Sequence, residues 1–379
     1  MMFALTDNQE QVRSSTERLA RERLAPTARE RDVARTIPHE LLRTLGENGL
    51  LAMTLPGELS GSELDVVSYA LAIREIAKAD ASVAVTVAVT NMVGEVIKTF
   101  GNPAQCERHI PNLASGEYFA GSFALSESSC GSDAANLTTR ARRTDKGWAI
   151  TGEKAWITSG HKAGVFVVWA RTSDDGARGI TCFLVRPGTP GFSVGKAEDK
   201  MGQNASHTVS LAFDNVEVAA DAVLGEIGAG FRIAMTALDG GRIGVGALAA
   251  GIATAALGKA RAYVRERKQF GKALADFQGT QFALADMATE LDAGWLLVLR
   301  AAWLKEQRRP FTREAAMAKV FMSEASNRVV REAVQLLGGY GYMEEYDVAR
   351  YYRDARVTQI YEGTSEIQRM VIARDLLRC

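Results

Sequence analysis

The sequence has no excess of either charge, and it contains few cysteines and histidines. Its 45 Lys and Arg residues balance 45 Asp and Glu residues, and no Lys/Arg-rich run occurs, so a nucleic-acid partner is not expected. The four cysteines are far apart and form no CxxC pair, so neither a disulfide framework nor a zinc site follows from them. The four histidines show no ligand spacing, and we predict no metal.

No segment predicts export or a membrane span. The first ten residues are polar and lack the apolar stretch of a signal peptide. The most apolar run, Val83 to Val93, is followed by Glu95 and Lys98, and it is shorter than the ~20 residues that a spanning helix needs. We therefore expect this run to be a buried helix and the protein to be cytoplasmic.

The pattern of apolar residues changes twice along the chain, and 379 residues are too many for one simple core. Helical patterns dominate 1–116 and return in long apolar segments over 228–379, where they suggest an antiparallel bundle. Residues 117–227 instead contain short strand-like runs separated by Gly-, Asp- and Ser-rich turns. The sequence thus predicts an α+β multidomain protein, with an N-terminal helical domain, a middle β-barrel or sandwich and a C-terminal helical bundle. The expected strands cover 118–125, 147–151, 165–170, 180–185 and 208–213.

The segment around Glu362 is the strongest local candidate for chemistry. Glu362 lies between the apolar pair Ile360-Tyr361 and Gly363, just before a helix that we expect to begin near Ser365 with the capping box SEIQ. Carboxylates are favoured near helix starts, so this one could be only a solvated or capping group. Alternatively, an apolar wall raises the pKa of a carboxylate, which is how a general base is tuned.

Four other segments each allow a structural and a functional interpretation. Residues 267–272 are either a cationic helix end with a glycine stop or an anion clamp. Residues 335–341 are either a plain helix end or a place of close backbone approach to a ligand. Because they lack the GxGxxG order and a preceding strand, a Rossmann nicotinamide site is excluded there. Residues 126–133 are a surface turn or a loop offering N–H and hydroxyl groups to a cofactor, and 156–160 could flank an aromatic heterocycle.

In this order, the segments together resemble the acyl-CoA dehydrogenase family over essentially the whole chain. The resemblance is closest to short-chain (butyryl-CoA) members, through the stretch Leu238–Gly244 and through Glu366. The matching stretches are Phe123–Glu127 with Gly131–Asp133, Trp156–Thr158, Arg267–Gly271, Gln335–Gly339 and Tyr361–Arg369.

The resemblance implies an α-helical domain, a β-barrel and a four-helix bundle, with FAD between barrel and bundle. It implies a homotetramer that passes electrons to an electron-transfer flavoprotein. It also implies that Glu362 takes the α-proton of a short acyl-CoA while a β-hydride passes to flavin N5, which yields the trans-2-enoyl-CoA. The implied FAD-binding residues are Phe123, Leu125, Ser126, Ser132, Trp156, Ile157, Thr158, Arg267, Phe270, Gln278, Gln335, Gly338, Gly339, Thr364 and Glu366, some of them acting across a subunit interface. The implied acyl-CoA-binding residues are Ser132, Asp239, Arg242 and Gly363.

Two positions bear on how closely the chain follows the family pattern. The family places its base either in the Tyr-Glu-Gly block or just before the arginine of the first long bundle helix. The second position is Gly241 here, which cannot accept a proton, so Glu362 is the predicted base. The family usually has Pro-Gly where this chain has Ser128-Ser129, and loss of that glycine removes easy access to positive φ.

Three alternatives remain open at this point. An acyl-CoA oxidase would share these residues and pass electrons to oxygen. A dehydrogenase for branched or medium-length acyl groups would look nearly identical. A non-enzymatic scaffold of this fold would have lost Glu362 or the FAD motifs, and neither is lost.

Overall fold

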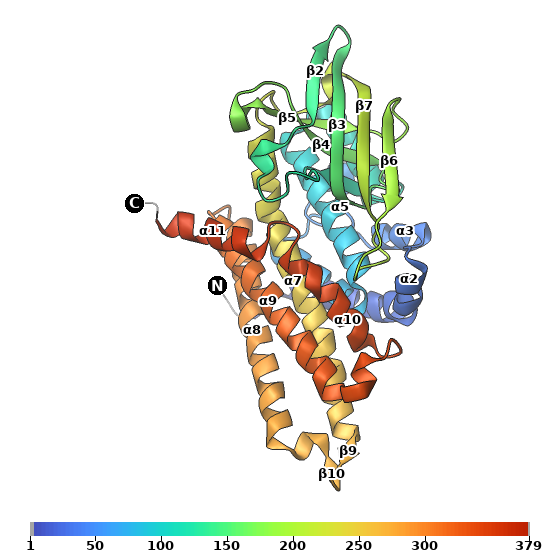
Figure 1. Cartoon of the computed structure of the whole chain (residues 1–379), viewed down its shortest axis with the longest axis vertical. Coiled ribbons are helices and arrows are strands. Elements are labelled where there is room, and N and C mark those ends of the chain that lie inside the picture. The colour runs from blue at the N-terminus through green and yellow to red at the C-terminus, as the bar shows by residue number, and fades with distance from the viewer. Residues whose placement is uncertain (1–3, 378–379) are drawn as a thin grey trace.

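The computed structural model describes residues 4–377, and the chain runs through a helical part, a β-sheet part and a second helical part (Figure 1). The first helix changes to a π-helical turn, Ala20–Leu24, after its first thirteen residues. A 3-10 turn, Ala25–Thr27, follows and contains Pro26, which has no N–H to donate to a helix. The helices of the first part are α1 (Asp7–Leu19), α2 (Ala28–Ala34), α3 (His39–Glu47), α4 (Val66–Ala79), α5 (Ala81–Phe100) and α6 (Pro103–Ala114).

Helix α5 forms the centre of the first helical part. It begins where Asp80 accepts hydrogen bonds from the N–H groups of Ser82 and Val83, which would otherwise lack partners at a helix start. Its apolar run is buried, which confirms the predicted core helix. By length and composition alone α5 and α7 could cross a membrane, but 72% of the most apolar stretch of each is buried inside the fold.

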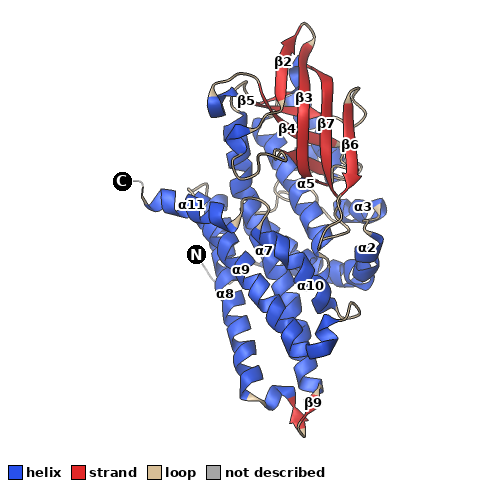
Figure 2. Ribbon diagram, in the orientation of Figure 1, coloured by secondary structure: helices blue, strands red, loops and turns tan. Residues whose placement is uncertain are grey.

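The middle part is one eight-stranded mixed sheet that folds into two layers (Figure 2). Its strand order is β6-β7-β3-β2-β4-β5-β8, with β1 parallel to β4, and the layers enclose a separate apolar core. Three strands were not predicted, because Arg140–Thr144 is rich in arginine, Phe192–Ala197 contains glycine and lysine, and Val223–Leu224 has only two residues. The strands are β1 (Gly121–Ala124), β2 (Arg140–Thr144), β3 (Gly147–Thr158), β4 (Val165–Arg171), β5 (Ile180–Val185), β6 (Phe192–Ala197), β7 (Thr208–Ala219) and β8 (Val223–Leu224).

The second helical part is built around α7, whose 37 residues span about 55 Å. Helix α7 packs against α8 and α9 of its own part and against α4 and α5 of the first part. The short strands β9 and β10 lie at the end of the bundle that points away from the sheet (Figure 1). The elements are α7 (Gly230–Glu266), β9 (Lys268–Gln269), β10 (Lys272–Ala273), α8 (Gln278–Glu306), α9 (Thr312–Leu337), α10 (Asp347–Arg356) and α11 (Ser365–Leu376).

The predicted capping box at Ser365 is wrong. The residue that caps α11 is Thr364, whose hydroxyl accepts a hydrogen bond from the Ile367 N–H at 3.4 Å. Gln368 does not reach the start of its own helix. Its amide instead donates to the carbonyls of Glu362 (3.1 Å) and Gly363 (2.9 Å), because the chain before α11 turns back over it.

Candidate active site

Glu362 lies in the turn before α11 and has a strained backbone. Its φ is +55° and that of Gly363 is +86°, so two successive residues are left-handed. This conformation costs a residue with a side chain roughly 1–2 kcal/mol, and such strain persists where the surrounding structure enforces it, commonly at functional sites. No hydrogen bond from the Glu362 N–H occurs within residues 4–377, which leaves that donor free for a ligand.

The Glu362 carboxylate faces a notch in α7 formed by Gly241. A Cβ atom at position 241 would lie 2.6 Å from Glu362 Oε2 and 3.0 Å from the Met92 sulfur. Oε2 is buried and has no hydrogen-bond partner among the described residues. Burial raises the pKa of Glu362 to about 7, against the opposing effect of the Arg242 and Lys319 cations. A buried carboxylate that titrates near neutrality and has an unused oxygen is suited to accept a proton from a ligand.

The two predicted acyl-CoA residues of α7 form an ion pair with each other. Arg242 is buried and donates to Asp239 at 2.6 Å, and the Thr312 hydroxyl donates to the other Asp239 oxygen at 2.5 Å. Burial raises the pKa of Asp239 although both partners oppose the shift. The charge of Arg242 also acts on the Glu362 carboxylate, so Arg242 connects this pair to the site, whereas Ser132 lies in an exposed loop of the middle part.

The predicted flavin residues of the middle part lie on β1, in the loop that follows it, and at the end of β3. Ser122 Oγ donates to the Thr158 carbonyl at 2.7 Å, and the Ala155 N–H donates to the Ser126 carbonyl at 2.9 Å, which ties the segment after β1 to β3. Trp156 is 64% exposed and left-handed, with φ +64°. A large exposed aromatic residue held in this conformation fits the wall of a site for a planar ligand.

Three other predicted residues of this group have side chains committed to packing. Ile157 is buried in the core of the sheet, so only its backbone is available to a cofactor. The Phe123 ring packs at a tilt against Trp169, with the ring centroids 4.3 Å apart. Leu125 is buried too, and its carbonyl accepts a hydrogen bond from Lys154, whose ammonium is inaccessible to solvent and pairs with Glu127 at 2.8 Å.

Six more of the predicted FAD residues lie at the far end of the bundle and form the bundle-tip group. Phe270 is 94% exposed, and the Arg267 guanidinium lies over the Tyr340 ring at 5.8 Å. Between Gly241 and Arg267 the helix extends about 39 Å, and the end with β9 and β10 points away from the sheet (Figure 1). The bundle-tip group therefore lies far from the predicted flavin residues of the sheet within one chain. Its residues, all exposed, are Arg267, Phe270, Gln278, Gln335, Gly338 and Gly339.

Thr364 and Glu366 lie beside the candidate base. Thr364 caps α11, and Glu366 is exposed in its first turn. The pKa of Glu366 is lowered by hydrogen bonds from its own backbone and from Thr364. Both residues thus present oxygens at the end of the turn that carries Glu362.

The Ser128-Ser129 replacement does not disturb the turn after β1. Glu127 and Cys130 exchange both backbone hydrogen bonds, at 3.0 and 3.1 Å, around the two serines. Neither serine has a positive φ, so the turn needs no glycine. Glu127 accepts from the backbone N–H groups of Thr138 and Thr139, which anchors this turn to the start of the next segment.

Lys319 and Lys154 were not predicted from the sequence as residues of the site. Lys319 is inaccessible to solvent and donates to the Gly363 carbonyl at 2.7 Å. The only sequence signals for these residues were weak. Lys319 lies among alanines in AAMAKVF, and Lys154 lies two residues before Trp156. Lysine is almost never fully buried unless it is paired, but burial itself could not be deduced from either pattern.

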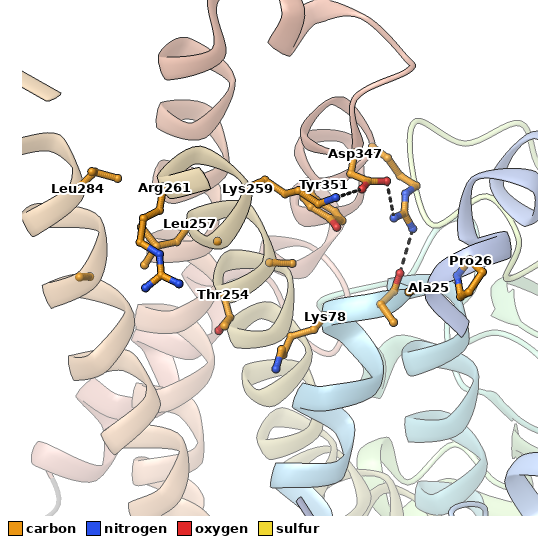
Figure 3. Close-up of a pocket in the computed structure, with 15 residues that line it drawn as sticks. Ala25, Pro26, Lys78, Thr254, Leu257, Lys259, Arg261, Leu284, Asp347 and Tyr351 are labelled. Atoms are coloured by element: carbon orange, nitrogen blue, oxygen red, sulfur yellow. Dashed lines mark hydrogen bonds and ion pairs between the residues drawn. The ribbon is translucent and has the colours of Figure 1, made fainter. Parts of the chain in front are cut away.

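A pocket of about 920 Å³ lies on another side of α7 (Figure 3). Its lining includes an ion pair between Lys259 and Asp347 at 2.7 Å, and Asp347 also accepts a hydrogen bond from Arg350 at 3.3 Å. None of the predicted site residues lines it. The candidate active site is therefore the Glu362 notch and not this pocket.

Models of known protein families match each of the three parts of this chain. The acyl-CoA dehydrogenase N-terminal, middle and C-terminal domain models match residues 6–117, 122–216 and 228–377. This chain belongs to the acyl-CoA dehydrogenase family. It is 45% identical to the short-chain specific acyl-CoA dehydrogenase of Megasphaera elsdenii, with all of both chains covered.

Solved structures of acyl-CoA dehydrogenase family members have the same fold. The butyryl-CoA dehydrogenase of Megasphaera elsdenii matches with a TM-score of 0.97 and 45% identity over 100% of both chains. A chain in a structure of the electron transferring flavoprotein of Acidaminococcus fermentans, described in terms of flavin-based electron bifurcation, matches with a TM-score of 0.98 and 42% identity over 100% of both chains. A glutaryl-CoA dehydrogenase from Mycobacterium smegmatis in complex with FADH2 matches with a TM-score of 0.94 and 33% identity, over 98% of this chain and 95% of that one.

FAD is the cofactor of this family, and the residues present fit it. Trp156 and Phe270 are exposed aromatic residues with left-handed backbones, one beside the sheet and one at the bundle tip. The glycines at 338 and 339 would meet nothing within 4 Å if they carried a Cβ, so a ligand can approach the backbone there. Trp156, Thr158 and Ser126 would hold the flavin end, and the bundle-tip group would hold the phosphates.

Proposed function

We propose that this protein catalyses the α,β-dehydrogenation of a short, straight-chain acyl-CoA of about four to six carbons, with Glu362 as the base and an electron-transfer flavoprotein as the electron acceptor. We further propose that it acts as a homotetramer in the cytoplasm. The observation that carries the proposal is the Glu362 carboxylate, which is buried, has an unpartnered oxygen and faces a notch where any side chain at position 241 would collide with it.

Glu362 removes the α-proton, and the chain supplies the groups that make this removal possible. The α C–H of a thioester is only weakly acidic, so its loss requires hydrogen bonds to the developing enolate oxygen. The Glu362 N–H in the left-handed turn is suited to be one such donor, since it makes no hydrogen bond within residues 4–377. Bound FAD supplies the acceptor for the β-hydride.

The preference for short acyl groups is supported by the relatives. The Megasphaera elsdenii protein, 45% identical along the whole chain, is a short-chain specific enzyme. Each methylene buried is worth about 1 kcal/mol, so preference should fall gradually with chain length. A panel of acyl-CoAs from C4 to C12, scored by kcat/KM for flavin bleaching, tests this. A maximum at C8 or longer, or with a branched group, would contradict it.

Assembly is supported by the separation of the two cofactor groups. The sheet-side group, which contains Trp156, and the bundle-tip group, which contains Phe270, lie far apart within one chain, and both of these aromatic side chains are exposed. A neighbouring copy that brings its bundle tip to this sheet would complete the site, as symmetric oligomers commonly do. Light scattering should give four chains per particle, and a stable monomer with FAD bound would contradict the proposal.

Electron transfer to a second flavoprotein is supported by the match to the Acidaminococcus fermentans structure. The measurement is turnover in air with and without an electron-transfer flavoprotein. We expect turnover to depend on that protein. Rapid peroxide formation in its absence would instead favour an oxidase.

The decisive test of the base is Glu362→Gln, which keeps the size and the hydrogen-bonding capacity of the side chain but cannot take a proton. We expect the variant to fold, bind FAD and bind acyl-CoA, and to lose flavin reduction by about 10⁴-fold, the upper end for a general base. Glu345→Gln makes the same change at an exposed glutamate outside the site and should behave as the wild type. Near-normal reduction in Glu362→Gln would mean that another residue is the base.

A further inference from the structure

Lys319 is a buried cation without an acidic partner. It lies in the middle of α9, is 0% exposed, and forms no ion pair within residues 4–377. Its ammonium donates to the Gly363 carbonyl at 2.7 Å. Burying an ammonium group without an acidic partner costs free energy, which the rest of the fold must offset. Packing alone therefore does not explain a lysine at this position.

The carbonyl that Lys319 holds belongs to the turn of the proposed base. Glu362 and Gly363 are both left-handed, and their two carbonyls accept three side-chain N–H groups, one from Lys319 and two from Gln368. The donors come from α9 and α11, so the turn is fixed from two sides. This arrangement sets where the Glu362 side chain and its N–H point.

Few charged or titratable groups face the Glu362 carboxylate. The cations are Arg242 of α7 and Lys319 of α9, while Tyr69 of α4 and the neighbouring Tyr361 are neutral phenols whose pKa values burial raises. Arg242 pairs with Asp239 at 2.6 Å and has the larger effect on the Glu362 carboxylate. Lys319 has the next largest effect, and of the two cations it is the one that also donates to the turn of Glu362.

The groups around Lys319 lower its pKa but leave it charged near neutral pH. Burial lowers the pKa of Lys319 to about 8, while Glu362 opposes that shift and Arg242 adds to it. Glu366 and Glu324 raise the pKa from α11 and α9, but Glu324 is paired with Arg369 at 2.6 Å. Lys319 is therefore still charged near neutral pH.

We propose that Lys319 is a positioning residue for the base: its ammonium fixes the Glu362–Gly363 turn through the Gly363 carbonyl, and its unpaired charge favours the carboxylate form of Glu362. This inference rests on the proposed role of Glu362. A merely structural lysine would hold the turn without moving the pH at which Glu362 becomes able to accept a proton.

Two variants separate the hydrogen bond from the charge. Lys319→Gln keeps a donor for the Gly363 carbonyl and removes the charge, whereas Lys319→Met removes both. Arg331→Met removes an exposed cation from the same helix and is the matched control. The measurement is rapid-mixing flavin reduction by butyryl-CoA from pH 6 to pH 9, made on FAD-loaded enzyme, with FAD content and thermal unfolding recorded alongside.

Removing a cation beside a carboxylate raises the pKa of that carboxylate, so less Glu362 is ionised at pH 7. We expect both Lys319 variants to shift the midpoint of the pH profile upward by about one unit, and the rate at pH 7 to fall about fivefold, because the ionised fraction of Glu362 drops from about one half to about one tenth. Lys319→Met should also lose maximal rate at high pH, which Lys319→Gln should largely keep. Arg331→Met should leave the profile unchanged.

An unshifted midpoint in Lys319→Gln, with normal FAD content, would overturn the proposal even if Lys319→Met does not fold. The same holds if Arg331→Met shifts the midpoint equally. The base assignment is judged separately: flavin reduction that survives in Glu362→Gln removes Glu362 as the base whatever the Lys319 variants do.

Discussion

Moving the carboxylate from position 362 to position 241 tests the geometry of the active site directly. The two positions meet at one point, because a Cβ on Gly241 would lie 2.6 Å from Glu362 Oε2. A glutamate at 241 can therefore occupy the place of the present base only if Glu362 is shortened. The experiment compares Glu362→Gly, Gly241→Glu and the double variant.

The single variants should both be nearly inactive, for different reasons. Glu362→Gly removes the base and should lose about 10²–10⁴-fold in flavin reduction. It also relieves a left-handed conformation that costs a residue with a side chain roughly 1–2 kcal/mol, so the protein should unfold at the same or a higher temperature. Gly241→Glu crowds a filled site, at about 1–3 kcal/mol, and places two carboxylates where one pKa must rise strongly.

The double variant should recover at least about tenfold over Glu362→Gly, or about 1.4 kcal/mol of transition-state stabilisation. With Oε2 removed, the remaining close contact at 241 is the Met92 sulfur at 3.0 Å, and methionine adapts easily. The matched control is Glu362→Gly with Gly258→Glu, which adds the same residue to the same helix where a Cβ meets nothing within 4 Å. The assay is single-turnover flavin bleaching with butyryl-CoA. Equal rates for the double variant and this control would refute the proposed geometry.

Three further outcomes are expected. The rate of flavin reduction should rise with pH and reach half its maximum near pH 7, because the base is active only when Glu362 is deprotonated, and a flat profile from pH 6 to pH 8 would contradict this. Lys154→Met should lower the free energy of unfolding by about 3–5 kcal/mol in a denaturant titration, because it leaves the Glu127 carboxylate buried and unpaired; a loss below 1 kcal/mol would show that the pair contributes little. Phe270→Ala should weaken FAD binding in fluorescence titrations without lowering the unfolding temperature of the FAD-free chain, because the side chain is 94% exposed, and unchanged FAD affinity would remove it from the site.

Local patterns in the sequence were sufficient to predict much of the fold. The long helices were predicted within residues 228–379, where the structure has them, since helical periodicity acts within a few positions of the chain. The strand Ile180–Val185 was predicted at its observed bounds because it is apolar throughout. Strands β2 and β6 were missed because their partners in the sheet, and not their own composition, make them strands.

The position of the proposed base also followed from the resemblance to the family, which implies one of two positions for it, and glycine at 241 left only Glu362. What the sequence could not provide was the distance between the two positions, which depends on how the turn before α11 packs on α7. The roles of Lys319 and Gln368 could not be predicted either. Lys319 is distant in sequence from the turn that it contacts, and Gln368 contacts the turn only because the chain reverses its direction before α11. Burial, and the shift of the Glu362 pKa that it causes, arises only when helices distant in sequence close around the side chain, and so it was decided by the tertiary structure alone.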